Sequence, residues 1–184
     1  MKTIPVCIKL LQHHNIKKEL LREICSYLNL IAIRFPELLI KYTYYIFNAV
    51  LKGHTCLTHL LYQICEAKIE CIYPLIRYLI QSLTIIENKN DLSYVFQIIY
   101  LISLNHVQLV IVHMDDIICF IDDEYFQDYV FDILFSVASQ MPIALENYLN
   151  LFNNNNNSNQ SNYYDSYKVD KIISTVGKSL KVIT

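Results

Sequence analysis

The chain of 184 residues carries 15 Lys and Arg against 17 Asp and Glu, a formal net charge of −2, and 54% of its residues are apolar. An apolar content above the usual ~45–50% excludes a disordered or fibrous chain. Two glycines are too few for a sandwich, a barrel or a Gly-rich phosphate loop, and the near-neutral charge gives no indication of nucleic-acid binding.

Apolar residues recur at helical spacing along most of the chain. Segment 15–33 has one apolar and one charged face, and Asn15 is its predicted N-cap. The apolar face comprises Ile16, Leu20, Leu21, Ile24, Cys25, Leu28 and Ile31. Seven further helices are predicted: 36–52, begun by Pro36 and ended by Gly53; 56–67, capped by Thr55; 74–86, begun by Pro74; 92–104, capped by Asp91; 106–121; 123–140; and 142–152, begun by Pro142.

The prolines Pro5, Pro36, Pro74 and Pro142 lie 31, 38 and 68 residues apart. A helix pair of roughly 34–45 residues is typical of tetratricopeptide, HEAT and armadillo arrays. Because the chain has no Trp, the tetratricopeptide pattern is absent. The sequence therefore predicts an all-α fold, a HEAT/armadillo-like α-α superhelix of about four helix pairs and one more helix.

Three regions are predicted along the chain. Residues 1–152 form the helical-repeat region, residues 153–167 an Asn-rich disordered loop, and residues 168–184 a further helix that continues the array. The apolar residues of that last helix are Val169, Ile172, Ile173, Val176 and Leu180. Because solenoids need polar terminal repeats and neither end has one, we interpret the sequence as an excerpt from a longer array.

A cytosolic chain with reduced thiols is predicted. No cleavable signal peptide begins the chain, and no run reaches the ~18 apolar residues that a membrane span needs. The six cysteines stand mostly among apolar helical positions, where a reduced thiol is buried as a small hydrophobe. They are Cys7, Cys25, Cys56, Cys65, Cys71 and Cys119.

The net charge hides an asymmetry, because residues 1–90 carry +5 and residues 91–184 carry −7. Between residues 91 and 150 there is no Lys or Arg against nine acids, five of them within 115–124. Two interpretations stay open: an acidic surface over 115–132 that attracts a basic partner segment, or acids at the N-terminus of a helix at 122–124. The alternating ladder and central Gly of a calcium loop are absent.

Other candidate sites have weaker patterns. His54, Cys56, His59 and Cys65 lack the spacing of a zinc site, so core and surface roles are favoured. His113 beside Asp115 and Asp116, and the serines Ser136 and Ser139, have no surrounding catalytic motif. No catalytic, cofactor-binding or metal-binding residue is therefore predicted.

Aromatic and basic side chains suggest two further surfaces. Among the 15 tyrosines, Tyr42, Tyr44 and Tyr45 could form a peptide-binding face, although tyrosine rings are more often packed with only the hydroxyl exposed. Because acids interleave with the basic side chains near the N-terminus, a solvated helix face is favoured over contact with anionic lipid. These basic residues are Lys17, Lys18, Arg22, Arg34 and Lys41.

The order of segments resembles the N-terminal helical-repeat region of the Melted family, the ventricular zone-expressed PH domain-containing proteins. The likeness runs in order from about residue 4 to 180, with the Asn-rich insertion as a departure. The residues that carry it are Ile4-Pro5-Val6, Asn15, Glu19-Leu20, Tyr27-Leu28-Asn29-Leu30, Ala32-Ile33, Leu38-Leu39, Thr43, Leu51-Lys52-Gly53-His54-Thr55, Pro142-Ile143-Ala144-Leu145 and Val176-Gly177.

This resemblance implies a non-enzymatic adaptor in growth-factor signalling of the insulin or transforming-growth-factor type. In that family a C-terminal PH domain binds phosphoinositides at the plasma membrane, and nothing in this chain corresponds to it. The chain would then contribute protein contacts. Two alternatives remain: a self-contained helical-bundle interaction or inhibitor protein, and a helical enzyme with a His/Asp site around His113.

Overall fold

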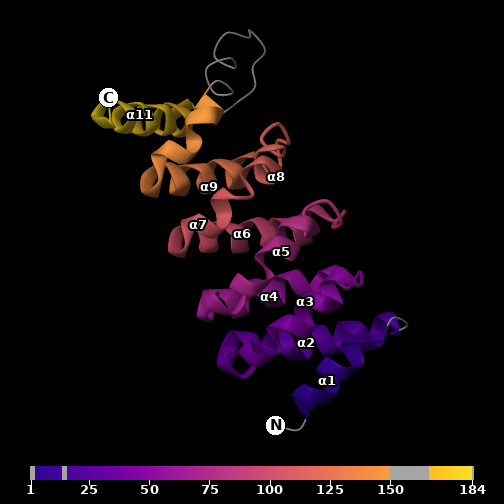
Figure 1. Ribbon diagram of the computed structural model, residues 1–184. Helices are drawn as coiled ribbons and strands as arrows, with labels where there is room; N and C mark the ends of the chain where they lie inside the picture. Colours follow the sequence, from indigo (N-terminus) through magenta and orange to yellow (C-terminus); the bar gives the residue numbers. More distant parts are fainter. Residues whose placement is uncertain (1–2, 14–15, 150–165, 184) are drawn as a thin grey trace. The chain divides into compact units, whose positions relative to one another are not determined.

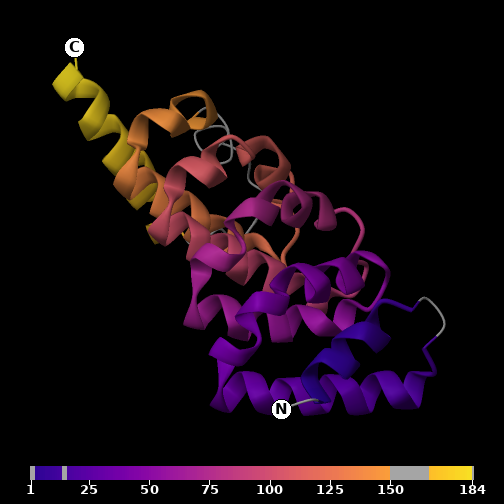
Figure 2. The same ribbon diagram turned by 60° about the horizontal axis from the view of Figure 1, so that its bottom comes forward.

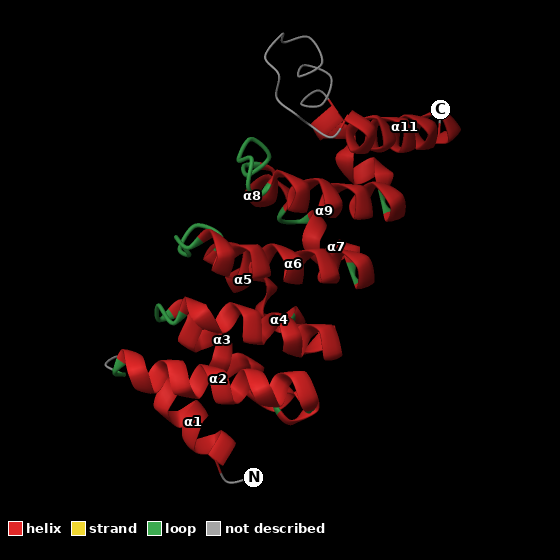
Figure 3. Ribbon diagram, turned by 180° about the vertical axis from the view of Figure 1, so that it is seen from behind, coloured by secondary structure: helices red, strands yellow, loops and turns green. Residues whose placement is uncertain are grey.

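A computed structural model describes residues 3–13, 16–149 and 166–183, and within these ranges every regular element is helical and none is a strand (Figure 3). The prediction of an all-α protein is confirmed. The described residues fall into two compact units, Met1–Leu101 and Ile102–Thr184, which are taken in turn.

The first unit is built from pairs of short helices (Figure 1). Helix α2 packs against α4, α3 packs against α4, and α1 contacts both α2 and α3. Figure 2 shows α1 crossing the long α2 obliquely. The α-helices are α1 (Thr3–Leu11), α2 (Lys18–Arg34), α3 (Thr43–Leu51), α4 (Thr58–Ala67), α5 (Ile76–Ser82) and α6 (Lys89–Asn105), which ends in the second unit. The 3-10 helices are η1 (Pro36–Leu38), η2 (Ile40–Tyr42), η3 (Thr55–Leu57), η4 (Ile69–Cys71) and η5 (Tyr73–Leu75).

The second unit centres on α9 (Gln127–Gln140), whose apolar face contacts α7 (Val107–Ile111), η6 (Pro142–Tyr148) and α11 (Ser166–Ile183). A short helix, α8 (Met114–Ile118), precedes α9. Phe131 and Leu134 of α9 and Ile172 and Val176 of α11 are almost completely buried. Burial of these side chains fixes both helices in the unit.

One backbone feature occurs four times among the described residues, each time directly after the last residue of an α-helix. Phe35, Lys68, His106 and Met141 all leave the helical conformation with φ between −158° and −140° and ψ between 57° and 91°. The N–H of each donates to the carbonyl four residues earlier, over 2.6 to 3.0 Å. These residues lie 33, 38 and 35 positions apart in the sequence.

A buried apolar residue follows each of these four breaks at the same distance. Four positions after the breaks stand Leu39, Ile72, Val110 and Leu145, and each is 0% exposed. The side chain therefore anchors the segment after each break in the core. Proline follows the break directly only twice, at Pro36 and Pro142, while the other two breaks are followed by Ile69 and Val107.

Several predicted helix ends need correction. Pro36 does begin helical structure, but as a 3-10 helix, and Gly53 ends α3 with φ 99° as predicted. Thr55 does not cap α4: its hydroxyl donates instead to Asp91 Oδ2 at 2.6 Å. Asp91 does not cap α6 either, because the Asn88 side chain accepts the Asp91 N–H at 3.0 Å.

Some segments differ from the predicted helices as a whole. The sequence did not predict α1, although proline is tolerated in the first turn of a helix, where the backbone N–H has no helical partner. Segment 106–121 is two short helices instead of one, and the helix predicted from 142 is 3-10 as far as Tyr148. The capping role of Asn15 and the Asn-rich loop at 153–162 lie outside the described residues.

Candidate interaction surfaces

The acids at the start of α8 interact with other side chains of the second unit. The Tyr148 hydroxyl of η6 donates to Asp115 Oδ1 at 2.6 Å, and this hydrogen bond is the main cause that raises the pKa of Tyr148 to about 12. His113 Nδ1 lies 3.8 Å from Asp116 Oδ2. Asp115 is therefore part of the contact that attaches η6 to α8.

The acids at 122–124 lie in the turn before α9 and not in its first helical turn. Helix α9 begins at Gln127, and the residue before it, Phe126, makes no side-chain cap. Asp123 Oδ1 instead accepts the N–H of Tyr125 within the turn at 2.9 Å. Interaction with the helix dipole, which falls off within one turn, therefore does not account for these acids as predicted.

Two acids of α9 form ion pairs with Lys168, which lies outside the range 91–150 that has no Lys or Arg. Lys168 of α11 places its Nζ 2.8 Å from Asp132 Oδ1 and 3.7 Å from Asp128 Oδ1. The Lys168 side chain is 28% exposed, compared with 80% for Asp128. The ion pairs attach α11 to α9 at the edge of their apolar contact.

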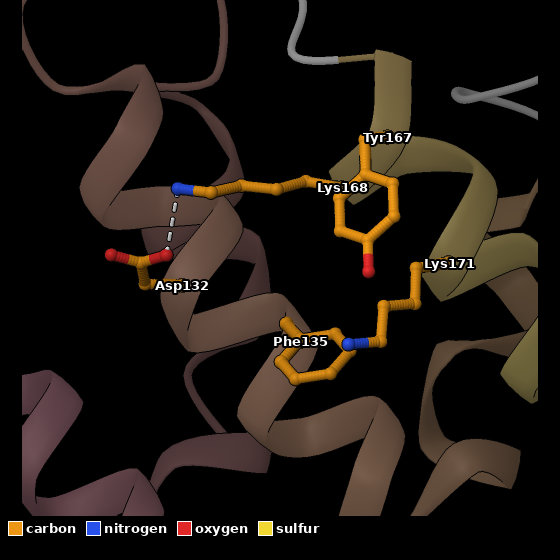
Figure 4. Close-up of a pocket in the computed structure, with 5 residues that line it drawn as sticks. All are labelled: Asp132, Phe135, Tyr167, Lys168 and Lys171. Atoms are coloured by element: carbon orange, nitrogen blue, oxygen red, sulfur yellow. Dashed lines mark hydrogen bonds and ion pairs between the residues drawn. The ribbon is translucent and has the colours of Figure 1, made fainter.

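Figure 4 shows a pocket of about 310 Å³ beside this ion pair, lined by Asp132 and Phe135 of α9 and by Tyr167, Lys168 and Lys171 of α11. The Lys171 ammonium lies 4.6 Å from the centre of the Phe135 ring and 5.5 Å from that of Tyr167. Both lysines thus already interact with groups of the chain, one with a carboxylate and one with two aromatic rings. The charged side chains of the lining are thus paired across the contact between α9 and α11.

The other residues considered for catalysis make local contacts. Ser139 donates to the carbonyl of Phe135 at 2.8 Å, and Ser136 receives a hydrogen bond from Gln140 at 3.1 Å. Both serines are bonded within their own helix. In the cluster at 113–116, Asp115 is hydrogen-bonded to Tyr148, and His113 lies beside Asp116 at the start of α8.

The four residues weighed as zinc ligands are not gathered around one point. His59 contacts Gln63 at 3.3 Å, and the rings of His59 and Tyr94 lie 4.7 Å apart. Cys65 is buried in α4, and the buried Nε2 atom of His54 has no hydrogen-bond partner. Across the ranges that the structure describes, no three His, Cys, Asp or Glu side chains are placed to hold a metal ion.

Tyrosines on the first unit are more exposed than the general rule for this residue suggests. Tyr44 and Tyr45 of α3 are 60% and 48% exposed and meet edge to face at 5.6 Å, and Tyr78 of α5 is 51% exposed. Tyr42 is half-buried, with Lys41 over its ring. The basic side chains of α2 and its neighbourhood, Lys17, Lys18, Arg22, Arg34 and Lys41, are all exposed.

The cysteines follow the prediction only in part. All six are free thiols, and Cys7, Cys25 and Cys65 are buried as expected. Cys56 and Cys119 are exposed, and Cys71 is half-buried. Cys56 and Cys119 were predicted to be buried because their neighbours in the sequence are apolar. Both lie in or beside very short helices, where helical spacing does not show which side faces the core.

Comparison with known proteins finds ventricular zone-expressed PH domain-containing proteins of three mammals. The chain is 29% identical to the human protein over 153 residues, 26% to the mouse protein over 149 and 25% to the rat protein over 149. The chain spans 17% of the length of each, while 79% of this chain is matched. The predicted resemblance to the Melted family is thereby confirmed.

Two further comparisons bear on the chain. No family model and no solved structure matches it. None of the helices within the described ranges is both long enough and apolar enough to cross a membrane.

Proposed function

We propose that this chain, which is similar to the ventricular zone-expressed PH domain-containing proteins, is the helical-repeat part of a non-catalytic adaptor. The observation that carries the proposal is the fourfold recurrence of one backbone break, each followed after four residues by a fully buried apolar side chain. A period of 33 to 38 residues is long enough for one helix pair, and helix-pair repeats stack into superhelices that present an extended binding surface.

The proposed cellular role rests on the resemblance to the Melted family. Each is named for a PH domain, and the chain corresponds to only 17% of their length. In this proposal a PH domain outside the chain binds phosphoinositides and holds the protein at the cytoplasmic face of the plasma membrane. The helical part then contacts proteins of a growth-factor pathway of the insulin or transforming-growth-factor type.

The surface proposed for a partner is the acidic turn, which we define as Asp116, Asp122 and Glu124. All three side chains are exposed, and the chain has no Lys or Arg between residues 91 and 150. Asp115, Asp128 and Asp132, which the sequence placed in the same surface, help to hold η6 and α11 and are therefore left unaltered in the test. A basic peptide segment is the partner whose charge matches this turn.

The test measures binding of a fluorescent ten-residue Lys/Arg peptide to the full chain at low and at physiological salt. Reversing the acidic turn with D116K, D122K and E124K is expected to weaken binding at least tenfold, and added salt to weaken binding to the unaltered chain. The control variant reverses three exposed acids elsewhere, E19K, E23K and D170K, with the same change in net charge. Equal loss in both variants would show that only the net charge attracts the peptide and would refute the proposed surface.

A further inference from the structure

Two cysteines from different helix pairs of the first unit lie next to each other. Cys25 Sγ in α2 and Cys56 Sγ in η3 are 3.4 Å apart, although 31 residues separate them in the chain. Cys25 is buried, whereas Cys56 is exposed. A disulfide bond measures about 2.05 Å, so small rotations of the two side chains have to bring the sulfurs about 1.4 Å closer.

We propose that Cys25 and Cys56 are a redox-active dithiol, which a peroxide converts into an intrachain disulfide that joins α2 to η3. Cys56 is the attacking thiol, because a reagent from solvent reaches it. Cys25 is the resolving thiol, because it is shielded from solvent and lies against Cys56. This division of roles is the arrangement in which cysteines respond reversibly to oxidation.

The electrostatics of the pair agree with these roles. The hydrogen bond between the two sulfurs lowers the pKa of Cys56 and raises the pKa of Cys25. Partial burial and the nearby carboxylate of Asp91 act in the opposite direction on Cys56 and moderate this effect. The thiolate that attacks a peroxide therefore forms on the exposed sulfur first.

The reaction balances in two steps. The Cys56 thiolate attacks one oxygen of hydrogen peroxide, the O–O bond breaks, and the released hydroxide takes up a proton to become water, leaving a sulfenic acid. The Cys25 sulfur then attacks Cys56 Sγ, so that the S–S bond forms and the S–O bond breaks. The hydroxyl leaves as a second water with the proton from Cys25.

The structural result is a covalent connection between consecutive helix pairs. Helices α2 and α4 already pack together, and η3 leads directly into α4. Closing a loop of this length in the unfolded chain is expected to raise the thermal midpoint of the first unit by about 5 °C or more. Reduction by an excess of dithiothreitol is expected to reverse the shift.

The test treats the reduced full chain with one equivalent of hydrogen peroxide and identifies linked tryptic peptides under non-reducing conditions. The expected product joins peptide 23–34 to peptide 53–68, with fragmentation placing the bond at Cys56 and not at Cys65. C56S is expected to abolish this product, and C119S, which alters the other exposed cysteine, to leave it unchanged. Absence of the linked peptides from the unaltered chain, or a bond to Cys65 in their place, overturns the proposal.

A second measurement tests the role of Cys56 without any oxidant. Iodoacetamide labelling at pH 8 is expected to be several times faster at Cys56 than at Cys119. Both thiols are exposed, but burial and Asp116 raise the pKa of Cys119, while the neighbouring thiol lowers that of Cys56. Faster labelling of Cys119 would contradict the assignment of Cys56 as the attacking thiol.

Discussion

Both apolar burial and ion pairs hold α11 against α9, and two substitutions can separate their contributions. Ile172 of α11 is 0% exposed, and replacing it with Ala removes three carbon atoms from the core. At ~0.8 kcal/mol for each carbon the loss is about 2.4 kcal/mol, and the cavity left behind extends the range to about 2–5 kcal/mol. Since 1.4 kcal/mol corresponds to a factor of ten, I172A is expected to increase local opening of α11 by roughly 25-fold or more.

The ion pairs of Lys168 are expected to contribute much less. Asp132 and Asp128 are 45% and 80% exposed, so that water screens both carboxylates. An exposed pair contributes about 0.2–1 kcal/mol, and the pair at 3.7 Å with the 80% exposed Asp128 adds little to the one with Asp132, so that the change in the opening equilibrium is at most about fivefold. K168M removes both pairs and keeps an aliphatic side chain in place of the lysine stem.

Hydrogen exchange of peptides from 166–183, in the regime where exchange reports the opening equilibrium, compares the two variants directly. K178M makes the same chemical change at an exposed position of α11 and serves as the control. The reasoning is wrong if K168M accelerates exchange as much as I172A does. Such a result would show that charge, and not buried apolar area, holds α11 in place.

Two further predictions concern the two glycines and the hydrogen bond between Tyr148 and Asp115. G53A is expected to lower the free energy of unfolding in urea by about 1–2 kcal/mol because Gly53 has φ 99°. G177A in α11 is expected to raise it by up to about 1 kcal/mol, because Ala favours a helix more than Gly does. A Cβ meets nothing within 4 Å at either glycine, so equal effects of the two substitutions would contradict this reasoning. The hydrogen bond to Asp115 favours the neutral phenol of Tyr148, so its stabilisation is present below pH 10 and is lost as the pH rises to about 12. D115N is expected to return the pKa of Tyr148 towards 10 in an NMR titration of ring-labelled tyrosine, and an unchanged pKa would show that burial alone causes the shift.

Helical periodicity predicted the fold class and most helices because buried side chains dominate the sequence pattern. The residues Ile24, Cys25 and Leu28 of α2 are buried as that pattern requires, but Leu20 at its start is 40% exposed. Periodicity shows which residues share a face, whereas burial also needs a neighbour to cover that face. At the N-terminal end of α2 the packing ends before the apolar pattern does.

Helix ends were predicted less well because they depend on contacts between segments. Thr55 has the chemistry of an N-cap, but its hydroxyl is bonded to Asp91, 36 residues further along the chain. Asn88, which provides the cap of α6, lies four residues before the predicted start of that helix at residue 92. Local preference identifies residues able to cap a helix, and the tertiary contacts decide which of them does so.

The four helix breaks were also predicted only in part, because their common feature is not a residue type. Proline marks the breaks at Phe35 and Met141, where it comes next in the chain, so two of the four breaks could be read from sequence. At Lys68 the nearest proline, Pro74, comes six residues later, and after His106 stands Val107. The recurring element is a backbone conformation and a buried side chain, which different residues can provide.

Three of the acids between residues 91 and 150 accept hydrogen bonds from neutral donors. Asp91 accepts from Thr55, Asp115 from Tyr148 and Asp123 from a backbone N–H, and none of these donors brings a positive charge. Lys168 does bring one, but at Asp128 and Asp132, away from the acidic turn. Hydrogen bonding thus fixes side chains of this region without cancelling its charge, and the field that would attract a basic partner is still present when the local contacts are formed.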